Sequence, residues 1–341
     1  MLSPRLRKAF GNWWEHSRGN HLMGTNECLG SPSAPTGSTD NRAALDEDLK
    51  QMLSRLMPPL PLPPGETEES LYRYLGAFRV EGAPPEELKR YVQSDFRRFV
   101  YTLGLVPQQA GDALEIGANP YFTSILLQRF TKWRLTFTNY FGSSHPRVAC
   151  ETVISEASRE RLCFEYHNIN VESTDLRSEL GREFDLVLFC EVIEHLTNDP
   201  LGALLRINEV LRPSGVLVLT TPNVARLANV AKLLAGVNIY DPYSGYGAYG
   251  RHNREYNRHE LVHLLAHAGF EVEVFFTADV LPTDAHHFCD LAKVLPLVSH
   301  RAADLGHYHF CRARKRRRGR ARKPSWLYRS YPPEQMVEVQ I

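Results

Sequence analysis

The stretch that most constrains the fold is ALEIGANPYFTSILL, which runs from Ala113 to Leu127. Residues 113–116 have the composition of a buried strand, and Gly117 follows them directly. A helix is expected to begin near Tyr121. A strand, a glycine turn and a helix N-terminus together place backbone N–H groups and the positive end of a helix dipole beside a ligand. The stretch therefore predicts a ligand-binding turn in an α/β fold.

Further strands are expected to alternate with helices from residue 112 onward, which predicts a parallel sheet with helices on both faces. The run at 184–190 is apolar throughout, as is typical of a central strand buried on both sides. The seven expected strands are Ala113–Ile116, Arg134–Thr138, Leu162–Tyr166, Leu186–Cys190, Val216–Thr220, Phe270–Phe276 and Tyr308–Ala313.

Three segments in order carry a family resemblance. They are ALEIGANPY at 113–121, EFDLVLFCEVIEHL at 183–196 and LRPSGVLVLTTPN at 211–223. In sequence and spacing they resemble the motifs of class I S-adenosylmethionine (SAM) methyltransferases, and among these the bacterial enzymes that methylate oxygens of small molecules and sugars. The resemblance covers roughly residues 105–314. It implies a Rossmann-like, doubly wound, seven-stranded and mostly parallel sheet with SAM as the cofactor.

The resemblance also implies a cofactor site at the carboxyl ends of the first four strands. Its candidate residues are Glu115, Gly117, Asn119, Asn139, Asn168, Ile169 and Cys190. Two positions depart from the family. Tyr121 stands where a further glycine is usual, and Asn139 stands where an acid usually grips both ribose hydroxyls. Because an amide lacks the charge that strengthens such bonds, SAM is expected to bind more weakly or with help from another group.

The segment CEVIEHL holds the candidate catalytic residues Glu191, Glu194 and His195. Methylation of a hydroxyl needs in-line alignment and usually a base that removes the hydroxyl proton. Histidine suits that role near neutral pH. The resemblance to sugar O-methyltransferases implies His195 as the general base, with Glu191 or Glu194 orienting the acceptor. The alternative is a helix-start histidine bonded only to backbone.

A metal site is a second interpretation of the same segment. E-x-x-E-H also resembles the metal-binding motif of small-RNA 2′-O-methyltransferases and a motif of ubiquinone-pathway O-methyltransferases. With His252, the set would suit Mn²⁺, Fe²⁺ or Co²⁺ better than Mg²⁺. A bound ion could lower the pKa of a substrate hydroxyl. Histidine four residues before an aromatic is also common in methyltransferases without metal, so no metal is expected here.

The long connection between the fifth and sixth strands is a candidate substrate lid, because long loops in compact domains are often binding loops. Tyrosines spaced by Gly, Ser and Pro would offer flat apolar faces with polar tips to a sugar. The candidate substrate-binding residues are Tyr243, Tyr246, Tyr249, Arg251 and His252. The alternative is a solvent-exposed loop whose tyrosines pack on the core.

The rest of the chain is divided by composition. Residues 1–41 are polar and rich in Gly and Ser, and are expected to be disordered. Residues 42–104 are expected to form a helical extension that caps the cleft, with helices at 67–78 and 86–103. The methyltransferase domain is placed at 105–314 and a basic tail at 315–341.

Charge and cysteine content limit the partners and the compartment. The net charge of +1 conceals a run at 312–323 with nine basic residues, which leaves 31 basic against 39 acidic residues elsewhere, a net of −8. Such a run can bind nucleic acid through phosphates, but a solvated extension is favoured. No apolar run approaches the roughly 20 residues of a membrane span. The six cysteines show no paired spacing, so reduced, buried thiols in a cytoplasmic protein are expected.

These observations predict a SAM-dependent methyltransferase that acts on the oxygen of a small hydroxylated acceptor, such as a sugar or a glycosylated metabolite. A metal-assisted RNA 2′-O-methyltransferase is the first alternative. A non-catalytic binding scaffold is the second, and the departures at Tyr121 and Asn139 motivate it.

Overall fold

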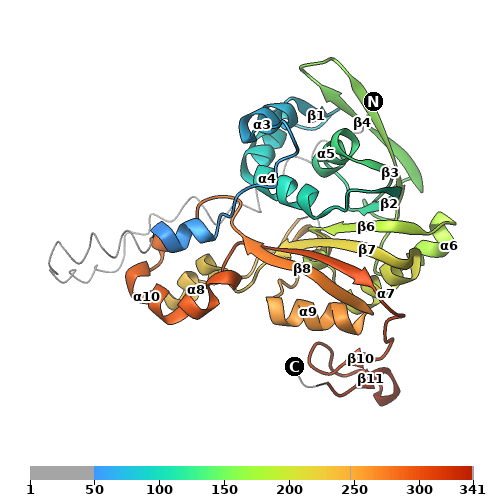
Figure 1. Cartoon of the computed structure of the whole chain (residues 1–341). Helices are drawn as coiled ribbons and strands as arrows, with labels where there is room; N and C mark the ends of the chain where they lie inside the picture. Colours follow the sequence, from blue (N-terminus) through green and yellow to red (C-terminus); the bar gives the residue numbers. More distant parts are fainter. Residues whose placement is uncertain (1–49, 246, 340–341) are drawn as a thin grey trace.

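The computed structural model describes residues 50–245 and 247–339. Its centre is a nine-stranded sheet with the order β1-β4-β5-β3-β2-β6-β7-β9-β8 (Figure 1). The strands of this sheet are β1 (Phe78–Val80), β2 (Ala110–Ile116), β3 (Lys132–Asn139), β4 (Val148–Ser155), β5 (Arg161–Asn168), β6 (Phe184–Cys190), β7 (Leu211–Pro222), β8 (Phe270–Ala278) and β9 (Tyr308–Lys315). All seven predicted strands are present, and the predicted count of seven was short by β1 and β4.

The sheet is doubly wound, as predicted. Strands β5, β3, β2, β6 and β7 run parallel, and β9 lies antiparallel between β7 and β8. From β2 the chain moves outward first through β3 to β5, and later through β6 to β7, so the strand order reverses between β2 and β6. In open α/β sheets, ligands bind beyond the carboxyl ends of the strands at this point of reversal. The topology therefore places a site beside the ends of β2 and β6.

Helices cover both faces of the sheet (Figure 1). One face carries α3 (Glu68–Gly76), α4 (Pro85–Leu105) and α5 (Phe122–Phe130), and the other α6 (Leu176–Leu180), α7 (Pro200–Val210) and α9 (Arg258–His267). A hydrophobic core lies on each face of the sheet. Strand β6 contributes side chains to both cores, because alternate side chains of a strand point to opposite faces. Leu186 and Leu188 pack in the first core, and Val187 and Phe189 in the second.

Helix α4 begins one residue before and ends two residues after the predicted range of 86–103. Pro85 occupies the first turn, where its missing N–H costs nothing, and Glu86 and Glu87 favour the positive end of the helix dipole. The helix packs on α3 and α5 and reaches across to β7 and β9. It therefore lies directly over the sheet.

A smaller apolar cluster lies to one side, formed by α8 (Leu227–Leu234), α10 (Leu291–Val298) and Leu56, which follows a helical stretch at 50–55. The predicted disorder of 1–41 and the first part of the helical pattern at 42–57 lie outside the described residues. No described helix has both the length and the apolar character that a membrane crossing requires.

The chain after β9 folds back on the domain. Strands β10 (Lys323–Pro324) and β11 (Met336–Val337) pair in a second, small sheet. The buried Tyr328 donates a hydrogen bond to Asp199 at the start of α7 (2.8 Å), and Lys323 pairs with the same carboxylate (2.7 Å). The C-terminal segment is thereby attached to α7.

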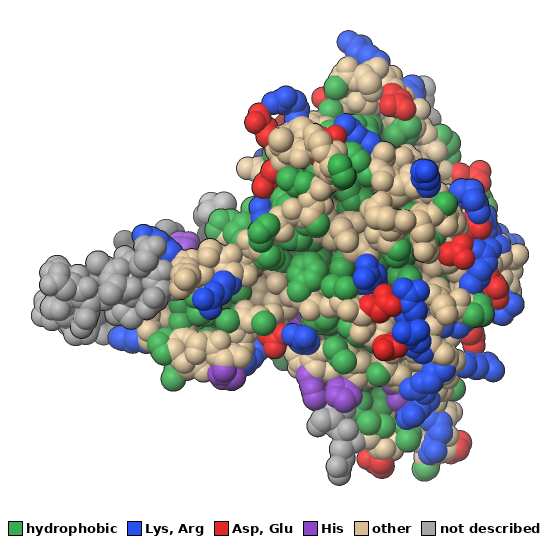
Figure 2. Space-filling view, in the orientation of Figure 1, with side chains coloured by type: hydrophobic (Ala, Val, Ile, Leu, Met, Phe, Trp, Pro, Cys, Tyr) green, Lys and Arg blue, Asp and Glu red, His purple; other side chains and the backbone are tan. Residues whose placement is uncertain are grey.

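The basic run at 312–323 lies largely on β9 and its continuation. Arg312 and Arg314 pair with Glu273 of β8, and Arg316 pairs with Glu271. Figure 2 shows Lys and Arg side chains interleaved with acidic side chains on the part of the surface that carries the ends of β8 and β9. Residues 312–315 of the run therefore belong to strand β9 and carry local ion pairs, where a solvated extension was expected.

One cysteine prediction was wrong. Cys150 of β4 and Cys163 of β5 form a disulfide, with Cα atoms 6.1 Å apart. Both residues are exposed, where reduced and buried thiols were expected. The disulfide joins the two strands of the β4–β5 hairpin. It could not be predicted from the sequence because strand β4 was not predicted. Cys190, Cys289 and Cys311 are free, and Cys28 lies outside the described residues.

Candidate active site

The first turn of the site follows β2 as predicted. Gly117 has φ 75° and donates its N–H to the Thr138 carbonyl (2.8 Å). A Cβ at Gly117 would lie 2.6 Å from Cγ2 of Val192, so both the backbone angle and the space require glycine. Tyr121, the N-cap of α5, has a left-handed backbone with φ 70°.

Tyr121 points into the core and not over the site. Its ring is fully buried and stacks on Phe164 with centroids 4.5 Å apart. The Tyr121 hydroxyl donates to Glu151 (2.5 Å) and accepts from the Asn139 amide (2.9 Å). The Asn139 oxygen accepts from the Asn119 N–H (3.0 Å). Both polar atoms of Asn139 therefore have partners inside the protein, at the position expected to contact the ribose.

Two other predicted cofactor residues lie at strand ends. Glu115 is buried and accepts from Ser124 (2.6 Å), and burial raises its pKa to about 7. Burial likewise raises the pKa of the Cys190 thiol to about 12. Glu115 is therefore a carboxyl group that can be neutral or charged near neutral pH.

The predicted adenine pair sits after β5. Asn168 accepts from the Phe141 N–H and donates to the Gly142 carbonyl, both at 2.9 Å, so its amide holds the loop after β3. Ile169 is buried beside it. Of this pair, Ile169 has the apolar character that an adenine contact needs.

A buried polar cluster joins Glu191 to helix α4, and sequence reasoning missed it. Glu191 has φ 56° and accepts from Thr220 (2.8 Å). The Arg98 guanidinium lies 3.8 Å from Glu191 and 3.1 Å from Asp95. Burial raises the pKa of Glu191 to about 8, and Arg98 opposes the shift. The sequence does hold a signal for this cluster. Tyr91, Asp95 and Arg98 are spaced four and three residues apart, so they lie on one helix face, and that face is otherwise apolar.

Glu194 and His195 lie in the short turn η1 (Ile193–His195) after β6. Glu194 is fully buried, accepts from Thr221 (2.8 Å) through Oε2, and has no hydrogen-bond partner at Oε1 within 50–245 and 247–339. The Asn253 and Arg254 N–H groups donate to the Glu194 carbonyl. The turn is thus tied to the long loop that carries His252.

His195 is held in one orientation by that loop. Its Nδ1 lies 3.0 Å from the Arg251 carbonyl, which can only accept, so Nδ1 carries the hydrogen and Nε2 the lone pair of the neutral ring. Nε2 is 3.9 Å from Oε1 of Glu194. Burial and the charge of His252 lower the pKa of His195 to about 4. His195 is therefore a neutral imidazole at physiological pH.

His252 completes a convergent group. Its ring centroid is 4.9 Å from that of His195, and one ligand atom from each of Glu194, His195 and His252 lies within 4.8 Å of the others. Burial would lower the pKa of His252, but Glu255, hydrogen-bonded at 3.0 Å, and the charge of Glu194 raise it to about 9. The structure thus brings together three of the four residues of the metal interpretation, and Glu191 lies with Arg98 instead.

The predicted lid tyrosines divide into two kinds. Tyr243 is 88% exposed, and the Arg251 guanidinium lies 4.6 Å from its ring centroid. Tyr249 instead donates to Glu172 (2.8 Å) and accepts from Asn170 (2.9 Å), which fixes the end of the loop to the body of the domain. Tyr246 lies outside the described residues. Tyr243 and Arg251 therefore stay candidate substrate-binding residues of this loop.

Three buried carboxyl groups, Glu115, Glu191 and Asp279, predict a pH dependence of stability. Their pKa values are raised to about 7, 8 and 7, with burial as the main cause. A group with a raised folded pKa stabilises fully below its unfolded pKa and loses that contribution as pH rises through the folded value. The free energy of unfolding from urea titrations is therefore expected to fall between pH 5 and about 8.5.

The matched variants are Asp279→Asn and Glu165→Gln. The first removes one buried titrating group and should flatten the decline. The second changes an exposed glutamate of β5 and should leave the slope as in the wild type. An unfolding free energy that rises over this pH range would contradict the prediction.

Comparison with known proteins identifies the class. A family model described as a methyltransferase domain matches residues 88–274, more than half of the chain. The chain therefore belongs to the methyltransferase domain family. This agrees with the class of protein that its sequence motifs predicted.

Individual relatives are more distant. Ubiquinone biosynthesis O-methyltransferase of Rhodopseudomonas palustris (strain TIE-1) is 40% identical over 68 residues, which cover 20% of this chain and 24% of that protein. The match thus spans about a quarter of the curated relative. The N-methyltransferase NodS from Bradyrhizobium japonicum WM9, in complex with S-adenosylhomocysteine, is 17% identical with a TM-score of 0.41, covering 73% of this chain and 98% of NodS. A SAM-dependent methyltransferase from Mesorhizobium loti is 14% identical with a TM-score of 0.38. The match covers 65% of this chain and 97% of that protein.

The residues at the sheet edge fit the methionine end of SAM, which carries a carboxylate and an ammonium group. The Cys190 thiol is subject to the charges of Glu115, Glu191 and Arg98, so a cation and two carboxyl groups surround the end of β6. The buried Thr138 hydroxyl at the end of β3 has no hydrogen-bond partner in the described part of the chain. Arg98 would meet the carboxylate, and Glu115 or Glu191 the ammonium group.

Proposed function

We propose that this methyltransferase acts on a hydroxyl oxygen of a small acceptor, such as a sugar or a glycosylated metabolite. The observation that carries the proposal is His195, a buried neutral imidazole fixed by the Arg251 carbonyl at the carboxyl end of β6. The partial similarity to an enzyme named as an O-methyltransferase supports oxygen as the acceptor atom. The exposed Tyr243 beside Arg251 supports a hydroxylated ring as the acceptor.

The chemistry follows from the positions of the side chains. SAM, when bound, supplies an electrophilic methyl group. His195 takes the hydroxyl proton on Nε2 as the oxygen forms its bond to the methyl carbon and the carbon–sulfur bond breaks. The buried Glu194 beside it favours the imidazolium that results. The products are the methyl ether of the acceptor and S-adenosylhomocysteine. Arg98, Glu115 and Glu191 would hold the amino-acid end of the cofactor in line.

The test is methyl transfer to a panel of hydroxylated acceptors with isotope-labelled SAM, read by mass spectrometry. An alkali-stable methyl ether on a sugar or glycoside supports the proposal. A methylated amine, or an alkali-labile ester as the sole product, would overturn it.

We also propose the predicted cytoplasmic location. The Cys150–Cys163 disulfide, a bond uncommon in reducing compartments, is the observation that argues against it.

A second candidate chemistry is metal-assisted transfer. It is favoured by Oε1 of the buried Glu194, which has no hydrogen-bond partner among the described residues. Glu194, His195 and His252 offer one carboxylate and two imidazoles, a set suited to Mn²⁺, Fe²⁺ or Co²⁺. An ion held there would lower the pKa of a substrate hydroxyl. The RNA 2′-O form of this hypothesis has less support, because several basic residues of the run at 312–323 have acidic partners.

If the cluster binds a cation, Mn²⁺ is expected to bind the purified protein at one site by calorimetry, and His252→Ala should weaken that binding by at least about tenfold. His259→Ala changes an exposed histidine of α9 and is the control. Equal Mn²⁺ affinity in the wild type and in His252→Ala would sink the metal hypothesis and leave His195 as the base.

A further inference from the structure

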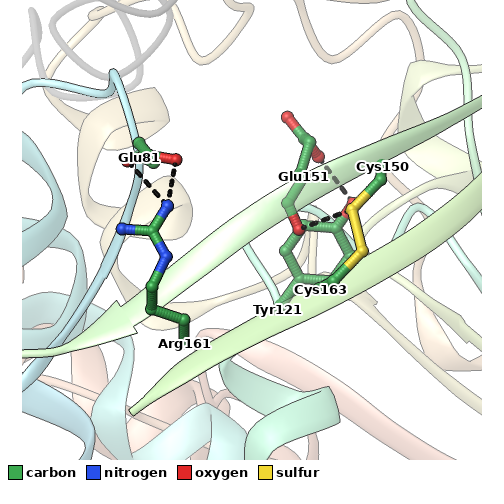
Figure 3. Close-up of a disulfide and its surroundings, with 6 residues drawn as sticks. All are labelled: Glu81, Tyr121, Cys150, Glu151, Arg161 and Cys163. Atoms are coloured by element: carbon green, nitrogen blue, oxygen red, sulfur yellow. Dashed lines mark hydrogen bonds and ion pairs between the residues drawn. A yellow bond between two sulfur atoms is a disulfide. The ribbon is translucent and has the colours of Figure 1, made fainter. Parts of the chain in front are cut away.

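The cofactor turn is held from an unexpected direction, by Glu151 of β4. Its Oε2 accepts from the Asn119 side chain (3.0 Å) and from the Tyr121 hydroxyl (2.5 Å). Asn139 closes the network by bonding to both the Asn119 N–H and the Tyr121 hydroxyl. Figure 3 shows the Glu151 carboxylate above the Tyr121 ring, beside the disulfide. One carboxyl oxygen thus links β4 to two residues of the turn that follows β2.

The part of β4 that carries Glu151 has limited support. The edge strand β1 pairs only with Val153–Ser155, and the Glu81 N–H extends this contact to the Thr152 carbonyl. Within the described residues, 148–151 therefore has strand pairing on one side alone, with β5. The Cys150–Cys163 disulfide crosses the hairpin at this same half, next to Glu151 (Figure 3). The Arg161–Glu81 ion pair lies at the other end of the hairpin.

We propose that Glu151 is a positioning residue for the cofactor turn, and that the disulfide beside it makes cofactor affinity depend on thiol reduction. Both cysteines are exposed and open to a dithiol. In the exchange the Cys150–Cys163 bond breaks and two thiols form, while the dithiol is oxidised to its own disulfide with transfer of two electrons and two protons. Loss of the cross-link returns freedom to the half of β4 that carries Glu151. The turn then loses the acceptor that fixes Asn119 and Tyr121.

The experiment measures the dissociation constant of S-adenosylhomocysteine by calorimetry, with the full chain oxidised or reduced by dithiothreitol. Glu151→Ala should raise the constant about tenfold, because it removes a charged acceptor of two hydrogen bonds. Glu151→Gln should stay within about threefold, since both bonds end on one oxygen that an amide oxygen can replace. Reduction should weaken binding several-fold in the wild type and cause no further loss in Glu151→Ala.

Two thiol controls separate this route from general effects of the reductant. The double variant Cys150→Ser, Cys163→Ser should bind S-adenosylhomocysteine with the affinity of the reduced wild type. Its affinity should not change when dithiothreitol is added. Cys289→Ser removes a free thiol elsewhere and should respond like wild type. Thermal melting confirms that each variant is folded. Unchanged affinity of the wild type on reduction, or equal weakening in Glu151→Ala, would overturn the proposal. No acceptor takes part, so the result is independent of the proposed O-methylation.

Discussion

Replacing His195 with alanine is expected to lower the rate of methyl transfer by roughly 10²- to 10⁴-fold, the usual contribution of a positioned general base. The affinity for S-adenosylhomocysteine should stay close to that of the wild type, because His195 is bonded to the Arg251 carbonyl and not to the cofactor turn. The measurement is single-turnover methyl transfer at saturating SAM, with calorimetry on the same samples.

The control for this prediction is His259→Ala, which changes an exposed histidine of α9 and should retain the wild-type rate. A His195→Ala enzyme with more than about a tenth of the wild-type rate would refute a general-base role. Loss of the rate together with loss of bound Mn²⁺ would assign His195 to the metal chemistry instead.

Replacing Arg98 with leucine is expected to lower the free energy of unfolding by about 3–5 kcal/mol, the cost of removing one partner from a buried ion pair. Arg98 is 6% exposed and lies against Asp95 and Glu191, so its loss leaves two buried carboxyl groups without a cation. Urea denaturation near pH 7 measures the change. If Arg98 meets the methionine carboxylate as proposed, the same variant should also weaken binding of S-adenosylhomocysteine.

A matched surface variant is Arg73→Ala, which breaks the exposed Arg73–Glu69 pair and should cost less than about 1 kcal/mol. Adding Asp95→Asn to Arg98→Leu should recover part of the lost stability, because the second change removes an uncompensated charge. Equal stabilities of Arg98→Leu and Arg73→Ala would show that the buried cluster is not an ion pair in solution.

Much of the fold follows from local patterns. The seven predicted strands are segments of strand length that are apolar or mix apolar with polar residues, and the glycine turn at 117 lies between β2 and α5 as its sequence requires. Strand β4 was not predicted, because the seven-stranded sheet that the family resemblance implies has no strand at 148–155. The disulfide was missed with it, since its two cysteines meet only when β4 and β5 pair.

The candidate site was predictable only in part. Glu194, His195 and His252 converge, because residues after β6 and those before α9 reach the same edge of the sheet. Arg98 and Glu151 come from α4 and β4, and their contacts with the site are set by packing between distant segments. Asn139 was expected to face the cofactor, but the Tyr121 hydroxyl provides a buried partner for its amide. This hydrogen bond depends on how the Tyr121 ring packs in the core, which the local sequence does not determine.

Helix α4 is expected to limit the motion of the active-site edge of the sheet. Its apolar side chains, among them Val92, Phe99 and Val100, belong to the same core as Leu186 and Leu188 of β6. Segments that share one core open together, at a cost close to that of unfolding the whole domain. A local fluctuation of the helix alone is therefore not expected to carry Arg98 away from Glu191. The positive charge at the end of β6 is as persistent as the sheet itself.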